Sequence, residues 1–134
     1  MSLTNWINFN LMGGEKGQLV ALEQYNNIPF EIKRVYYIVN LKPHEPRGFH
    51  AHKELKQVVI CLSGSCRILL DDGFQKDSAI LESSEKGIYV DSKIWHEMHD
   101  FSDDCILLVL ASEHYDELDY LRNYDDFLNL INHD

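Results

Sequence analysis

The stretch RGFHAHKELKQVVICLSGS, residues 47–65, carries the pattern on which the fold depends. Two histidines, His50 and His52, stand one residue apart, shortly before the run VVICL. This run is rich in the β-branched residues that strands favour. Side chains alternate between the two faces of a strand, so both imidazoles are expected on one face. Gly64 follows the run and predicts a hairpin turn with Ser63.

The strand pattern continues on both sides of this stretch. The segments with this character are EIKRVYYIVNL, FHAHK, KQVVICL, SCRILLD, SAILE, GIYVD, WHEMHDF and CILLVLA. Asp72-Gly73 marks a further tight turn. Seven or more short, evenly spaced strands predict an all-β sandwich or small barrel. The tail, residues 115–132, has apolar residues at helical spacing, and we expect a helix there with Asp116 as its N-cap.

Composition narrows the possible partners. The chain has 134 residues, which favours a single domain over residues 1–134. Its 22 acidic residues outnumber 12 Lys and Arg and give a net charge of −10, which disfavours a nucleic-acid partner. No signal peptide or membrane-length apolar segment is found, so we expect a cytoplasmic protein that does not enter a membrane.

Three cysteines show no metal-binding or disulfide spacing, and we expect reduced thiols. The turn predicted at Gly64 would bring Cys61 and Cys66 face to face. Small buried core residues are the simpler interpretation of both.

The order of polar residues around the two histidines indicates a cupin, in which an HxH pair, a carboxylate, a glycine and a distant third histidine follow one another. Here Gln57 stands at the carboxylate position and His96 at the third histidine. Three imidazoles suit a divalent transition metal, but Gln57 is a poor substitute for a carboxylate ligand. Two further interpretations remain: a histidine that exchanges protons inside a cavity, and histidines that only fill a core.

Cations near the histidines indicate an anionic ligand. Arg47 and Lys53 flank the pair, and Arg34 shares its strand face with Tyr36. The guanidinium group forms paired hydrogen bonds with phosphate. In the tail, Tyr120, Arg122 and Tyr124 are candidates to reach a base or a diphosphate.

The segments KRVYYIVN, PRGFHAHKELKQVVICLSGSCRILLDDG, WHEMHDFS and LLVLASEHYDELDYLRNYDDF resemble the nucleotide-sugar 3,4-ketoisomerases, over residues 17–127. This resemblance implies a double-stranded β-helix, or jelly roll, usually assembled as a homodimer. It also implies transfer of the carbonyl of dTDP-4-keto-6-deoxyglucose from C4 to C3 through an enediol, with no metal or organic cofactor. The product would serve an aminotransferase that leads to a 3-amino-3,6-dideoxyhexose of a surface glycan.

The resemblance also assigns roles to individual residues. His52 corresponds to the base that takes the C3 proton, and His50 to the group that returns a proton. Tyr36 matches an active-site tyrosine, although Tyr37 remains an alternative. The substrate-binding candidates are Arg34, Arg47, Lys53, Gln57, His96 and Lys16, where Lys16 stands at a position that relatives more often fill with Arg.

Two related activities remain as alternatives: a dTDP-sugar 3,5-epimerase and a metal-dependent cupin enzyme. The chemistry of the residues does not determine the configuration of the product at C4. The sequences of the motifs PRGFHAHK and WHEMHDFS are closer to those of family members that give the galacto form. Apolar residues in GQLVALE and in the tail predict that strands or the tail cross between two subunits.

Overall fold

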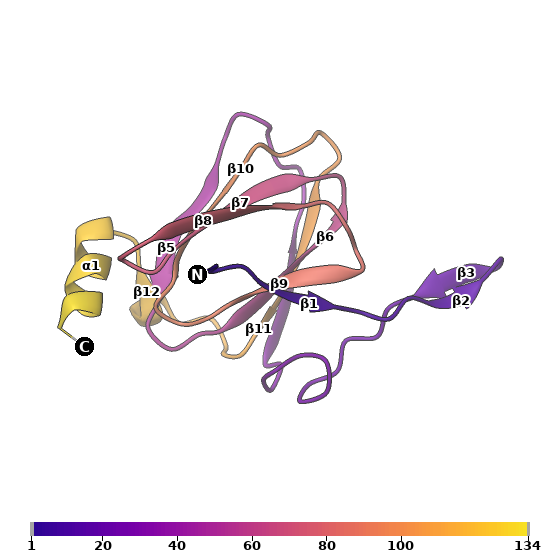
Figure 1. Cartoon of the computed structure of the whole chain (residues 1–134), viewed down its shortest axis with the longest axis horizontal. Helices are drawn as coiled ribbons and strands as arrows, with labels where there is room; N and C mark the ends of the chain where they lie inside the picture. Colours follow the sequence, from indigo (N-terminus) through magenta and orange to yellow (C-terminus); the bar gives the residue numbers. More distant parts are fainter. Residues whose placement is uncertain (1, 134) are drawn as a thin grey trace.

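Two five-stranded antiparallel sheets face each other in the computed structural model, which describes residues 2–133 (Figure 1). The first sheet has the order β1-β9-β6-β11-β4 and the second the order β12-β5-β10-β7-β8. The strands are β1 (Asn5–Asn8), β2 (Met12–Gly14), β3 (Gly17–Leu19), β4 (Arg34–Ile38), β5 (Arg47–His52), β6 (Gln57–Ser63), β7 (Cys66–Asp71), β8 (Lys76–Leu81), β9 (Lys86–Val90), β10 (Trp95–His99), β11 (Ile106–Ala111) and β12 (Tyr120–Leu121). The predicted all-β jelly roll with a short helix near the end is confirmed.

The chain changes sheets at Gly64, where the sequence predicted a hairpin. Strand β6 pairs with β9 and β11, whereas β7 pairs with β8 and β10, so β6 and β7 do not pair. Gly64 has a φ of 70°, and a Cβ there would lie 2.2 Å from the Ser102 hydroxyl oxygen. The predicted hairpin is therefore wrong, and the sulfur of Cys61 lies 4.0 Å from that of Cys105.

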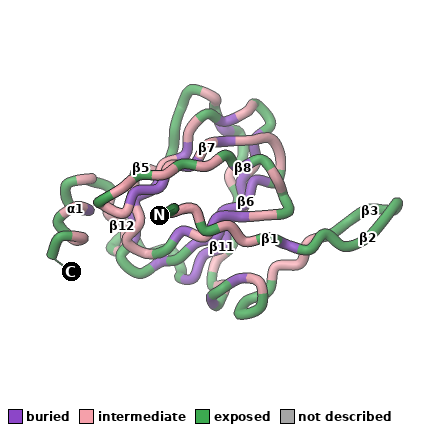
Figure 2. The backbone as a smooth tube through the Cα atoms, viewed as in Figure 1, coloured by how far each residue is buried: buried purple, intermediate pink, exposed green. Residues whose placement is uncertain are grey.

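Three apolar clusters hold the layers together. The largest fills the space between the sheets, and its fully buried members include Ile68, Ile88 and Leu107. The second covers the outer face of the first sheet, where the segment before β4 contributes Ile28 and Phe30. In Figure 2 the buried residues gather on the strands of the two sheets, whereas the hairpin β2-β3 is exposed.

The third cluster fixes the C-terminal helix on the second sheet. Helix α1 (Tyr124–Asn132) inserts the fully buried Phe127 against Ala51 of β5 and Trp95 of β10. None of the described helices is long and apolar enough to cross a membrane.

The tail is not one continuous helix, so the predicted start at Asp116 is wrong. Asp116 caps only the single turn η1 (Glu117–Asp119), and α1 has Asn123 as its own N-cap. Between the two helices, β12 pairs antiparallel with β5 and places Tyr120 opposite His52. Backbone groups at the edge of β5 thus find partners in the tail, which brings tail side chains to the histidines.

The hairpin β2-β3 projects away from the two sheets (Figure 1). Its apolar side chains are open to solvent: the exposed fraction is 47% for Met12 and 58% for Leu19. In a single chain, this hairpin therefore leaves apolar surface uncovered.

Candidate active site

A cavity of about 330 Å³ opens between the two sheets and is bordered by the tail. Six of the residues predicted for the site line it: Arg34, Tyr36, Arg47, His50, Gln57 and His96. They come from β4 and β6 on one side and from β5 and β10 on the other. The predicted grouping of side chains from distant segments is therefore observed for these six.

Three histidines form a cluster at one wall of this cavity. The ring centroid of His50 lies 5.1 Å from that of His52 and 4.6 Å from that of His96. The Nδ1 atoms of His50 and His96 lie 3.1 and 3.3 Å from the carbonyl oxygens of Gly48 and Ile94. A neutral imidazole donates from the nitrogen that faces a carbonyl, so Nε2 of His50 and His96 is left as an acceptor.

His52 lies deeper than expected for a residue that meets the substrate. Its exposed fraction is 3%, and it does not line the cavity, because Tyr120 packs over it with ring centroids 4.3 Å apart. Neither ring nitrogen of His52 has a hydrogen-bond partner within the described structure. Buried polar atoms without partners are rare and call for a functional explanation.

The environment keeps all three imidazoles neutral near pH 7. Burial lowers the pKa of His50 to about 4 and that of His96 to about 3. Burial, followed by the neighbouring His96 and His50, lowers the pKa of His52 to about 2. The cluster thus offers lone pairs for protons or metal ions rather than positive charge.

A β-bulge in β5 aims the histidines at one another. His96 lies opposite His50, but the next residue, Glu97, lies opposite Gly48, so Phe49 has no counterpart. Gly48 has a φ of 94°, and a Cβ there would lie 2.9 Å from the carbonyl oxygen of His96. Glycine at this position therefore allows the close approach of β5 to β10, and bulges commonly redirect side chains in this way.

The opposite wall carries a tyrosine held by an amide. Gln57 donates a hydrogen bond from Nε2 to the hydroxyl oxygen of Tyr36 at 3.0 Å, which leaves the tyrosine O–H free to donate into the cavity. Burial raises the pKa of Tyr36, so the hydroxyl stays protonated. Tyr37, the alternative from the sequence, points to the other face of β4 and is 69% exposed.

Arg34 brings an uncompensated positive charge to the same wall. Its Nε and Nη2 atoms are buried and have no hydrogen-bond partner within residues 2–133. The guanidinium carbon lies 5.1 Å from the ring centroid of Tyr36 and 5.7 Å from that of Tyr115. A buried guanidinium with free N–H groups is suited to an anionic ligand.

Besides His52, two predicted residues do not reach the cavity in a single chain. The side chain of Lys53 is exposed just beyond the end of β5, and its backbone N–H donates to the carbonyl oxygen of Asp119 at 3.0 Å. Lys16 lies in the turn between β2 and β3, on the projecting hairpin. Strand alternation cannot place either residue, because both lie outside strands.

The tail supplies residues that only partly follow from the sequence. Tyr120 and Arg122 line the cavity, as their proposed contact with a base or diphosphate requires. Tyr124 does not, because its hydroxyl donates to the buried carboxylate of Asp71 at 2.6 Å. Tyr115, in the loop before η1, also lines the cavity and was not predicted.

The donor set fits a metal only in part. The ligand nitrogens of His50, His52 and His96 all lie within 4.8 Å of one another, and no acidic residue joins this cluster within residues 2–133. Gln57 occupies the position of the cupin carboxylate ligand, and its amide donates a hydrogen bond to Tyr36. Three imidazoles without a carboxylate therefore leave the usual ligand set incomplete.

Comparison with known proteins agrees with this geometry. The family model described as "FdtA: WxcM-like, C-terminal" matches residues 2–132. A TDP-4-oxo-6-deoxy-alpha-D-glucose-3,4-oxoisomerase of Aneurinibacillus thermoaerophilus is 57% identical over 93% of this chain and 90% of its own.

Solved structures give the same result. A 3,4-ketoisomerase from Helicobacter canadensis has a TM-score of 0.95 and 47% identity, over 98% of this chain and 99% of its own. A sugar 3,4-ketoisomerase from Thermoanaerobacterium thermosaccharolyticum, solved in complex with TDP, has a TM-score of 0.94 and 42% identity, over 97% and 95% of the two chains.

Proposed function

Since this chain belongs to the family of nucleotide-sugar 3,4-ketoisomerases, we propose that it moves the carbonyl of TDP-4-keto-6-deoxyglucose from C4 to C3 by acid-base catalysis. The main support for this proposal is the set of side chains that line the cavity. Neutral histidines stand on one wall of it, and a protonated tyrosine and an unpaired guanidinium stand on the other. Proton transfer next to a ketone requires a base and donors for the enediolate, and these groups supply both.

In the proposed mechanism, His52 removes the proton from C3, which the adjacent C4 carbonyl acidifies. The electron pair of the C3–H bond forms the enediolate, and the Tyr36 hydroxyl donates a hydrogen bond to its oxygen. His50 then returns a proton at C4 or relays it between the oxygens. The Tyr120 ring must turn aside for the sugar to reach His52, and catalytic contacts often form only in the substrate complex.

Arginines at the cavity hold the diphosphate in this proposal. Arg34, Arg47 and Arg122 all line the cavity, and paired guanidinium hydrogen bonds match phosphate oxygens. We propose that no metal takes part, because Gln57 is a neutral residue whose amide already binds Tyr36. Gln57 instead orients the tyrosine.

We propose that the product has the galacto, fucose-like configuration at C4, because the sequences of the motifs PRGFHAHK and WHEMHDFS resemble those of family members with this product. The 3-keto sugar would then enter transamination, toward a 3-amino-3,6-dideoxyhexose of a surface glycan.

We also propose a homodimer in which the hairpin β2-β3 crosses to the second subunit. This hairpin projects from the sheets with Met12 and Leu19 exposed, so a second chain would cover its apolar surface. Lys16 lies at its turn, and the crossing would give this lysine access to a ligand in the other subunit. Light scattering should show a dimer at micromolar concentration; a fully active monomer would refute the proposal.

The function is tested by incubation with TDP-4-keto-6-deoxyglucose in deuterated water that contains EDTA, followed by NMR. We expect a 3-keto product with the galacto configuration at C4 and deuterium at the position that is reprotonated. Deuterium at C5 with the ketone still at C4 would indicate the 3,5-epimerase instead. Loss of turnover in EDTA that a divalent ion restores would indicate the metal-dependent alternative.

The base is tested by His52→Asn, which should lower turnover by about 10² to 10⁴, the usual contribution of a general base. The matched control is His44→Asn, because His44 is exposed in the loop before β5. A His52→Asn variant that keeps most of its activity would remove His52 from the mechanism.

A further inference from the structure

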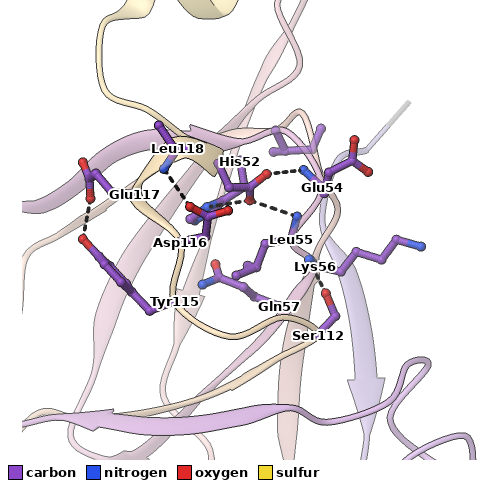
Figure 3. A network of polar contacts seen from close by, with 12 residues as sticks. His52, Glu54, Leu55, Lys56, Gln57, Ser112, Tyr115, Asp116, Glu117 and Leu118 are labelled. Carbon is purple, nitrogen blue, oxygen red and sulfur yellow. Dashed lines mark hydrogen bonds and ion pairs between the residues drawn. The ribbon is translucent and has the colours of Figure 1, made fainter.

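A carboxylate lies beside the buried ring of His52. The Oδ2 atom of Asp119 is 3.6 Å from Nδ1 of His52, and the two side chains are 14% and 3% exposed. Figure 3 shows the surroundings of His52 at the ends of β5 and η1.

Backbone groups hold this carboxylate in place. The N–H of Glu54 donates to Oδ1 of Asp119 at 2.8 Å, and the N–H of Leu55 donates to Oδ2 at 3.2 Å. In addition, the Lys53 N–H donates to the Asp119 carbonyl oxygen at 3.0 Å. Asp119 thus ties the tail to the segment that follows His52, and its side chain has little freedom to turn away.

The remaining neighbours of His52 cannot take the same role. His50 and His96 are neutral imidazoles, and Tyr120 is aromatic and packs against the ring. Arg34 and Arg122 act on the imidazole as positive charges that oppose its protonation. Within residues 2–133, Asp119 is the acidic residue within ion-pair distance of His52.

We propose that Asp119 is a positioning residue that holds His52 in the Nδ1–H form and stabilises the imidazolium formed during the reaction. This proposal rests on the assignment of His52 as the base. A short movement would bring Nδ1 of His52 and Oδ2 of Asp119, now 3.6 Å apart, within hydrogen-bond distance. Nδ1 would then donate its proton to the carboxylate, and the lone pair of Nε2 would be free to act on the sugar. The C3–H bond then breaks, its proton passes to Nε2, its electron pair enters the enediolate, and the Nδ1 proton stays between His52 and Asp119.

The role of Asp119 is tested by Asp119→Asn. Asparagine keeps one oxygen to accept from the Glu54 N–H, but its NH₂ group would face Nδ1 of His52 and favour the opposite tautomer. We expect kcat to fall by about 10² or more, as for loss of a general base, while the Kd for TDP changes less than about threefold. Asp116→Asn is the control, since Asp116 lies in the same segment and only caps η1. A folded Asp119→Asn variant with near-normal kcat would overturn the proposal, and so would equal losses in both variants.

A second measurement does not depend on turnover or on an Asp119 variant. In the wild-type protein with ¹⁵N-labelled histidine, the ring nitrogen shifts of His52, assigned by comparison with His52→Asn, report which nitrogen carries the proton. We expect Nδ1–H; an Nε2–H tautomer would overturn the proposal. If the wild-type protein did not convert the sugar, the proposed function would fail, while the tautomer would still decide whether Asp119 orients His52.

Discussion

Replacement of Arg34 by methionine should change stability and ligand affinity in opposite directions. Arg34 has two buried nitrogens without hydrogen-bond partners, so the ligand-free protein carries part of an uncompensated buried charge. Methionine fills a similar volume and removes that charge. The same substitution removes a donor that we place against the diphosphate.

The magnitudes follow from these contacts. A buried unsatisfied polar group destabilises by about 1–3 kcal/mol. Loss of the cation–π contacts with the rings of Tyr36 and Tyr115 reduces this gain in stability by about 0.5–1 kcal/mol each. The net gain in the free energy of unfolding is therefore on the order of 1 kcal/mol, or about 3–5 °C in Tm for a domain of this size. Binding loses a charge-assisted interaction worth about 1.5–3 kcal/mol, which is about a 10- to 150-fold higher Kd for TDP.

Thermal melting without ligand and calorimetric titration with TDP measure the two quantities. The control is Lys33→Met, which also removes one positive charge. Lys33 pairs with Glu113 at 3.3 Å in an exposed position, so both quantities should stay close to those of the wild type. An Arg34→Met variant that loses both stability and affinity would show that Arg34 supports the fold. Unchanged affinity would show that it does not meet the diphosphate.

Two further predictions concern stability. Burial lowers the pKa of three histidines from the usual 6.5: to about 4 for His50, about 3 for His96 and about 2 for His52. As the pH falls below 6.5, these histidines therefore take up protons in the unfolded chain before they do so in the folded protein. The free energy of unfolding, measured in urea, should fall as the pH drops from 6.5 toward 4. The fall should be shallower in His96→Gln, and equal slopes would contradict the buried neutral state. Tyr124→Phe removes the hydrogen bond to buried Asp71 and should cost about 1.5–3 kcal/mol in urea unfolding; an effect no larger than that of the exposed control Tyr37→Phe would contradict this reasoning.

Strand alternation correctly predicted which side chains share a strand face, because it is a local rule. It placed His50 and His52 on one face of β5, and Arg34 and Tyr36 on one face of β4. It did not predict the depth of His52. That depth depends on Tyr120, which reaches the histidine through strand pairing across more than 60 positions of the chain.

The two errors in the fold share a physical cause. A glycine turn such as Gly64 has the same local signature whether the next strand joins the same sheet or the facing one, and only tertiary packing distinguishes them. In the tail, Leu121 and Leu128 do pack in one cluster with α1, so the apolar spacing reported a real buried face. The spacing did not predict that strand pairing interrupts the helix. A continuous helix would have buried Leu118, whose exposed fraction is 83%.

The small cluster around Phe127 connects this fold to the proposed chemistry. It joins α1 to Trp95 of β10 and to Ala51, which lies between the two histidines of β5. The same cluster includes Leu121, so it holds the short strand β12 against β5. Strand β12 carries Tyr120 and lies directly between Asp119 and Arg122 in the chain. The apolar face of the tail thus fixes the strand, and the strand places an aromatic cover, a carboxylate and a cation around His52. The helix therefore contributes to the site through packing, although none of its own side chains lines the cavity.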